Sequence, residues 1–114
     1  ITDATAGAAA EPGGYKLGDM ELHLDYEPVV YNKKTSRPAG SAVTLDQCVR
    51  NVMQWYNVPL DEAVSWAGLN PLQLLKSSKI SHIYTQHNNS VWWEENDGEW
   101  YVKASRSGKF LYQS

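Results

Sequence analysis

Apolar side chains recur at helical spacing in the middle of the chain, and this stripe is the strongest constraint on its fold. One face of an α-helix carries such a stripe, because the helix has about 3.6 residues per turn. Thr44 and Gln47 have the spacing of a capping box at its start. The pattern predicts a helix over about 44–56 and places Cys48 in the core rather than at a nucleophilic site. The residues of the stripe are Leu45, Cys48, Val49, Val52, Met53 and Tyr56.

Two further helical segments follow this helix. One is predicted from Leu60 to about Gly68. Asn70-Pro71 then has the pattern of an N-cap followed by proline at the first helical position, and it opens a short turn through Leu75. The positions expected to be buried in the second helix are Leu60, Ala63, Val64 and Ala67.

Short segments with strand character flank the helices. Before them, 15–17, 21–24 and 29–31 predict a small meander, and 33–40 reads as a polar connection. The first fourteen residues are small and end in Pro12, Gly13 and Gly14, which is typical of a flexible loop. Strand segments that are separated in sequence from the helices predict an α+β chain.

A tryptophan-rich hairpin is predicted near the C-terminus. Asp97-Gly98 is a strong signal for a two-residue turn of type I′. With these two residues as the loop, the cross-strand pairs are 95/100, 93/102 and 91/104, and a third strand covers 109–112. One face then carries Val91, Trp93, Trp100, Val102 and Ala104. The other face carries Trp92, Glu94, Tyr101 and Lys103.

Composition narrows the classes of partner. Hydrophobic residues make up 42% of the 114 residues, and the net charge of −3 opposes binding to nucleic acid or to an anionic membrane. No apolar run approaches the ~20 residues of a membrane span. The single cysteine excludes an internal disulfide framework, and we expect a cytoplasmic protein. The chain starts at Ile1 without a signal peptide pattern and reads as though entered within a domain.

Three motifs together resemble one enzyme family. They are ITDAT at 1–5, PAGSAVTLDQCVRNVMQW at 38–55 and VPLDEAVSWAGLNPLQLL at 58–75. In this order and spacing they resemble the C-terminal third of N-acetylglucosamine-6-phosphate deacetylases, which are metal-dependent amidohydrolases. The segment KISHIYTQHNNSVWW departs from the family pattern, because it lacks two glycines and an Ala-Asp pair.

The resemblance implies a fold and an organisation. The chain would be the terminal part of a TIM-type (α/β) barrel together with part of a small β-sandwich domain. Residues 1–14 would end the last barrel strand and form an active-site loop, and 15–40 would form a β meander and a substrate loop. Residues 41–76 would hold the terminal helices of the barrel domain, and 77–114 would hold strands of the small domain.

The resemblance also implies an activity and site residues. The complete enzyme would convert N-acetylglucosamine 6-phosphate to glucosamine 6-phosphate and acetate. Asp3 matches the family's general base, which takes a proton from a metal-bound water and returns it to the leaving amine. Pro38, Ala39 and Gly40 match the stretch that lines the substrate pocket, although the family commonly has leucine where this chain has Pro38. Without the resemblance, Asp3 would read as a turn residue and 37–41 as a loop.

The implied cofactor is a divalent metal ion, zinc or similar. Its family ligands, a glutamate and two histidines, lie on earlier strands that are not in this chain. His23, His82 and His87 lack a third ligand at metal spacing, and we expect them to be structural or exposed. Family members often form homodimers. Because Asp3 stands near the amino terminus without a strand to orient it, we expect the chain alone to be inactive.

A noncatalytic alternative stays open. The aromatic residues of the hairpin could form a platform for a sugar ring or a proline-rich peptide. They would equally fill one face of a packed sheet. Three or more of them exposed on one surface would favour the binding module. Burial of Trp93 and Trp100 against the helices, with Trp92 at the rim, would favour the enzyme. The four aromatic residues are Trp92, Trp93, Trp100 and Tyr101.

Overall fold

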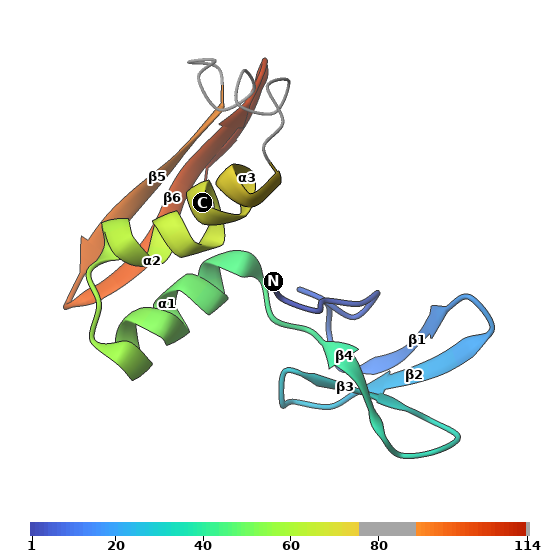
Figure 1. Cartoon of the computed structure of the whole chain (residues 1–114). Helices are drawn as coiled ribbons and strands as arrows, with labels where there is room; N and C mark the ends of the chain where they lie inside the picture. The colour runs from blue at the N-terminus through green and yellow to red at the C-terminus, as the bar shows by residue number, and fades with distance from the viewer. Residues whose placement is uncertain (76–88, 114) are drawn as a thin grey trace. The chain divides into compact units, whose positions relative to one another are not determined.

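The computed structural model describes residues 1–75 and 89–113. In these residues it has two antiparallel sheets and three helices, which confirms the predicted α+β class (Figure 1). The chain divides into two compact units, Ile1–Asn51 and Val52–Ser114.

The first unit contains a four-stranded meander in the order β1-β2-β3-β4. Its strands are β1 (Gly13–Leu17), β2 (Met20–Leu24), β3 (Val29–Asn32) and β4 (Pro38–Ser41). The first three confirm the predicted strand segments. The alternation of β2 places Leu22 and Leu24 inward, where they form a core with Val30. Tyr15, Ala39 and Ala42 pack against that core.

β4 corrects the expectation of a polar connection and loop. Its backbone pairs with β3 through Val29↔Ser41 and Tyr31↔Pro38, with a register irregularity between them. The pairing also extends to the N-terminal segment, because Ala4 forms a parallel bridge with Ser41. These partners make a strand of a sequence that has little strand propensity of its own.

The predicted helices are all present. α1 (Leu45–Tyr56) and α2 (Leu60–Ala67) match their expected ranges, and α3 (Leu69–Leu75) begins one residue before Asn70. Asn70 therefore lies inside α3, and its side chain accepts a hydrogen bond from Ser65. Fewer helix residues are buried than expected, since Val49 and Ala63 are buried but Val64 is 37% exposed. Cys48 is half-buried.

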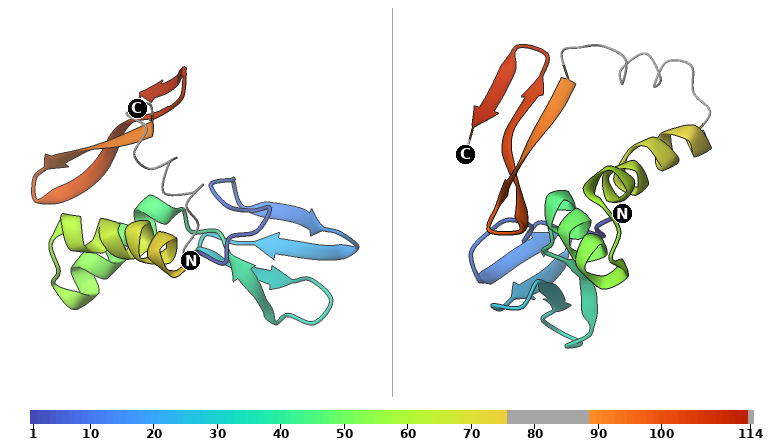
Figure 2. Two further views of the ribbon diagram at one scale, coloured as in Figure 1. Left: turned by 45° about the horizontal axis from the view of Figure 1, so that its top comes forward. Right: turned by 90° about the vertical axis from the view of Figure 1, so that its left-hand side faces the viewer.

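The C-terminal sheet confirms the predicted hairpin and third strand. It consists of β5 (Asn89–Asn96), β6 (Glu99–Ser107) and β7 (Phe110–Gln113), with β6 in the middle (Figure 2). The pairs Glu95↔Trp100 and Trp93↔Val102 agree with the predicted register. The predicted pair 91/104 is wrong, because a register shift between Trp92 and Trp93 pairs Val91 with Ser105.

The register shift is a β-bulge, and it places Ala104 on the face of the sheet that carries Trp92. Ala104 now lies opposite Trp92, whereas the unbroken ladder would have placed it with Trp93 and Val102. A bulge adds one residue to one strand and breaks the alternation of its side chains. The result is a sheet whose only buried hydrophobic residue, among those described, is Ala104.

Among the described residues, no helix has the length and apolar character needed to span a membrane.

Candidate functional site

The N-terminal segment that carries Asp3 is held against β4. The Ser41 N–H donates a hydrogen bond to the Asp3 carbonyl at 2.8 Å, and the Thr5 N–H donates one to the Ser41 carbonyl at 3.0 Å. The Ser41 hydroxyl donates to the Thr2 carbonyl. The expectation that no strand orients Asp3 is therefore wrong, since β4 pairs with the residues on both sides of it.

Gly40 lies next to this segment at a position that a side chain cannot occupy. A Cβ there would lie 2.4 Å from Thr5 Cγ2 and 2.8 Å from the Asp3 carbonyl oxygen. It would lie 3.8 Å from Asp3 Oδ2. The φ angle of Gly40 is +121°, which L-residues rarely adopt. Glycine is thus required here for two independent reasons, conformation and space.

The same segment is also fixed to the core of its sheet. Gly7 is buried, and a Cβ on it would lie 3.4 Å from the side chains of Leu24 and Tyr15. The same Cβ would lie 3.6 Å from Val30. The expectation of a flexible N-terminal loop is therefore wrong for this part of the chain, which packs on the core of its own unit.

The four predicted site residues have different surroundings. Asp3 is exposed and has a φ of +51°, so its carboxylate is reachable from solvent. Gly40 is half-buried beside it. Pro38 is exposed and pairs with Tyr31, and Ala39 packs against the core. The structure brings Asp3 and Gly40 together, and it adds Ser41 and Thr5, which sequence reasoning did not single out as site residues.

Metal-ligand side chains do not gather in the described part of the chain. Residues 1–75 and 89–113 contain no group of three or more His, Cys, Asp or Glu side chains that could hold a metal ion. His23 is exposed and hydrogen-bonds to Asp25 at 2.8 Å. His82 and His87 lie outside the described residues. The described residues by themselves therefore provide no complete set of metal ligands.

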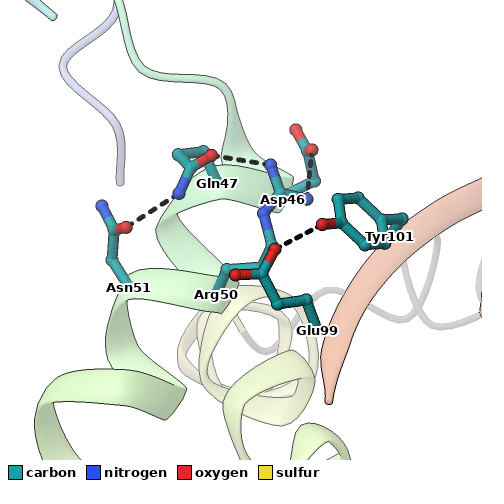
Figure 3. Close-up of polar contacts among 6 residues, drawn as sticks. All are labelled: Asp46, Gln47, Arg50, Asn51, Glu99 and Tyr101. Atoms are coloured by element: carbon teal, nitrogen blue, oxygen red, sulfur yellow. Dashed lines mark hydrogen bonds and ion pairs between the residues drawn. The ribbon is translucent and has the colours of Figure 1, made fainter. Parts of the chain in front are cut away.

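A polar ladder runs along the first two turns of α1 (Figure 3). Arg50 forms an ion pair with Asp46 at 2.9 Å and donates a hydrogen bond to Gln47 Oε1 at 2.8 Å. The Gln47 amide donates to Asn51 Oδ1 at 2.9 Å, so this side chain is engaged along the helix rather than in the predicted capping box. The spacings of three and four residues are those at which helical side chains meet.

The ladder changes the acidity of its carboxylate. Burial raises the pKa of Asp46, but hydrogen bonds from Thr44 and Arg50 and the charge of Arg50 outweigh it. The pKa of Asp46 therefore lies below its ordinary value of 3.8. The carboxylate also stands in the first turn of α1, where the positive end of the helix dipole favours an anion. These contacts lie within α1 and its N-terminal end, and they stabilise the helix itself.

The aromatic residues of the C-terminal hairpin divide between exposed and half-buried positions. Trp92 and Tyr101 are 45% and 44% exposed, and Trp93 and Trp100 are half-buried. The condition of three exposed aromatic side chains on one surface is not met. Trp92 lines an open hollow of about 450 Å³, and the rest of its lining is Lys103, Ala104, Arg106, Leu111 and Gln113.

Comparison with known proteins gives a consistent result. No family model matches the chain. The deacetylase of Vibrio furnissii is 35% identical over 75 residues, and that of Lysinibacillus sphaericus is 36% identical over 76 residues. Both carry the name N-acetylglucosamine-6-phosphate deacetylase, as does a human protein that is 32% identical over 79 residues. The chain is similar to one part of these deacetylases.

The matches cover most of this chain but only a small part of each relative. The matches cover 66%, 67% and 69% of this chain, but the chain spans only 18–19% of the length of these relatives. A crystal structure of N-acetylglucosamine-6-phosphate deacetylase from Pasteurella multocida matches the whole chain with a TM-score of 0.75. That match has 21% identity and covers 29% of the other chain, and it supports the fold. The predicted resemblance to this deacetylase family is confirmed.

Proposed function

We propose that the complete protein hydrolyses the acetamide of N-acetylglucosamine 6-phosphate, giving glucosamine 6-phosphate and acetate. The names of the relatives support this reaction. The observation that carries the proposal is the pairing of Asp3 with β4, since the Ser41 N–H and the Asp3 carbonyl are 2.8 Å apart. An exposed carboxylate on a fixed backbone has what proton transfer to a bound substrate requires.

The proposed role of Asp3 is to carry one proton through the reaction. Its carboxylate accepts a proton from the attacking water as the oxygen bonds to the acetamide carbon. It then donates that proton to the nitrogen as the carbon–nitrogen bond breaks. Hydrogen bonds from Ser41 to the main chain of Thr2 and Asp3 restrict the region that this carboxylate can reach, and such positioning favours efficient catalysis.

The strand beside Asp3 would form one wall of the substrate pocket. We assign Pro38, Ala39 and Gly40 to this wall, with Gly40 next to the carboxylate. The absence of a side chain at Gly40 lets β4 approach the Asp3 segment closely, because a Cβ there would overlap Thr5 and the Asp3 carbonyl. A divalent metal ion belongs to the family chemistry, but the described residues supply no ligand set for it.

A chimaeric enzyme tests the proposal. Residues 1–75 of this chain replace the corresponding segment of the Vibrio furnissii deacetylase, and amine release from N-acetylglucosamine 6-phosphate is measured. We expect turnover by the chimaera and a loss of about a hundredfold or more in Asp3→Asn, the usual range for removing a general base. Asp19→Asn is the matched control, because Asp19 is an exposed aspartate in the turn between β1 and β2.

Two outcomes would contradict the proposal. Full activity in the Asp3→Asn chimaera would show that this carboxylate carries no proton in the reaction. Equal losses in Asp3→Asn and Asp19→Asn would show an effect of charge or folding instead. We further propose that the 114-residue chain is inactive by itself, even with added zinc or another divalent cation, because it spans 18–19% of its relatives. Metal-dependent turnover by the purified chain, abolished by Asp3→Asn, would contradict that part.

A further inference from the structure

The tip of the C-terminal hairpin has a backbone arrangement that exposes a reactive pair of groups. Asp97 and Gly98 form the two-residue loop between β5 and β6, which the pair Asn96↔Glu99 closes. Their φ angles are +52° and +83°, so both are positive as in a type I′ turn. Both residues are exposed. Asp97 is also the one aspartate in the sequence that is followed by glycine.

The amide nitrogen of Gly98 is open to the side chain of the preceding residue. The cross-strand ladder ends at Asn96 and Glu99, so the loop residues lie outside it. Apart from Gly98 and its two chain neighbours, no residue places an atom within 4 Å of the position that a Cβ on Gly98 would occupy. Because glycine has no side chain, Gly98 itself adds no steric hindrance to an approach of the Asp97 carboxyl group to its nitrogen. The carboxyl carbon of Asp97 and this nitrogen are separated by the bonds that a five-membered ring needs.

We propose that Asp97 is a site of spontaneous conversion to isoaspartate. The Gly98 nitrogen attacks the carboxyl carbon of the protonated Asp97 side chain, a carbon–nitrogen bond forms, and the carboxyl hydroxyl group leaves with the amide proton as one water. The product is a cyclic succinimide. A water molecule then adds to the main-chain carbonyl carbon of Asp97 and breaks its bond to the Gly98 nitrogen. The chain now continues through the former side chain, and no mass is gained or lost.

The modification would act on the hairpin through the length of its loop. An isoaspartyl linkage adds one methylene carbon to the main chain between Asn96 and Gly98. A two-residue I′ loop fits the twist of its strands only with its normal backbone length. We therefore expect the modification to loosen the closing pair Asn96↔Glu99 and the bond from Tyr101 to Glu99, which lies next to it.

Peptide mapping of the aged chain tests this proposal. The 114-residue chain is incubated for several weeks at neutral pH, and isoaspartate is located by mass spectrometry and by labelling with an isoaspartate-specific methyltransferase. Asp19 is the internal control, because it is also exposed in a two-residue turn but precedes Met20. We expect isoaspartate at Asp97 to form about tenfold faster or more than at Asp19, which is a barrier difference of about 1.4 kcal/mol.

A variant and a peptide complete the test. Gly98→Ala should reduce the rate at Asp97 to that of Asp19. Equal rates at Asp97 and Asp19 in the unaltered chain would overturn the proposal, whether or not the variant folds. It would also be overturned if Asp97 stayed intact over a period in which an unstructured peptide of residues 94–101 isomerised, because the folded turn would then protect the pair.

Discussion

The two sheets of this chain differ in how they cover their apolar side chains. The four-stranded sheet buries Leu22 and Val30 completely and leaves Leu24 only 4% exposed. In the three-stranded sheet, Ala104 is the one buried hydrophobic residue among those described, and Phe110 is 78% exposed. The sheet that supports Asp3 thus has its own core within its unit. The tryptophan-rich sheet has none of comparable size among the described residues.

The difference locates the part of the chain that can hold a site by itself. The N-terminal segment lies on the core through Gly7 and on β4 through Asp3 and Thr5. Its position therefore depends on buried side chains of the same unit. In the other sheet, Trp92 and Tyr101 are 45% and 44% exposed, and Trp93 and Trp100 are half-buried. Asp3, the residue that we propose as the proton carrier, belongs to the first unit.

The largest difference between the two sheets should appear when a leucine side chain is shortened to alanine in each of them. Leu22→Ala leaves a cavity at a fully buried position, and we expect it to destabilise the first unit by about 2–5 kcal/mol. Leu111→Ala in β7 removes the same atoms from a side chain that is 52% exposed, and it should cost about 0.5 kcal/mol or less. Hydrogen exchange of the amides in β2 and β3 measures the first effect.

The choice of probe matters for this comparison. All five tryptophans lie at positions after 51, so tryptophan fluorescence reports only on the second unit. Similar losses of exchange protection in β2 for both variants would contradict the difference between the sheets.

A methyl group at Gly40 should have the next largest effect. The Cβ would overlap Thr5 and the Asp3 carbonyl, and the φ of +121° adds strain, so we expect Gly40→Ala to cost about 2–3 kcal/mol. Gly18→Ala is the matched control, because Gly18 has a φ of +58° but no atom within 4 Å of the added carbon. It should cost about 1 kcal/mol. Denaturant unfolding, monitored by hydrogen exchange of amides in the first unit, measures the two losses of stability. Equal losses would contradict the close approach of Gly40 to the Asp3 segment.

The smallest effect concerns the acidic end of α1. The pKa of Asp46 is lower in the folded chain than in the unfolded one, so its contribution is present above pH ~4 and is lost as the pH falls through the folded value. The ion pair with Arg50 is partly exposed, which limits the contribution to a few tenths of a kcal/mol. Asp46→Asn should remove this pH dependence from α1.

Asp61→Asn provides the control for that measurement. Asp61 occupies the same position in the first turn of α2. The stability of α1, measured by hydrogen exchange of its amides between pH 3 and 7, should remain pH-dependent in Asp61→Asn. Loss of the dependence in both variants would assign it to general charge rather than to the Asp46–Arg50 pair.

Local sequence patterns predicted most of the secondary structure. The apolar period around Val49 defined α1, and Asp97-Gly98 defined the hairpin with its first pairs. These features depend on residues close in sequence. The strand β4 was missed because its partners include Ala4, far away in the chain. The bulge was missed because no glycine at Lys103 or its neighbours marks the break in alternation.

The candidate site likewise combines features that local sequence indicates with contacts between residues far apart in the chain. Asp3 and Gly40 were identified through family motifs, and their residue types alone would have given a turn and a loop. Their contact depends on hydrogen bonds between Ser41 and the segment around Asp3, which no local pattern encodes. The signal that could have indicated it is the Ala-Gly-Ser sequence at 39–41, in which a glycine between strand residues is typical of a close backbone approach.

The turnover number of the chimaera carrying Gly40→Ala tests most directly whether β4 positions Asp3 for catalysis. The substitution leaves the carboxylate in the chain but displaces it, and a displacement of about 1 Å can cost about a hundredfold. We predict a loss of that size in Gly40→Ala and little change in Gly18→Ala, at a temperature where exchange shows both to be folded. Full turnover by a folded Gly40→Ala chimaera would contradict the account.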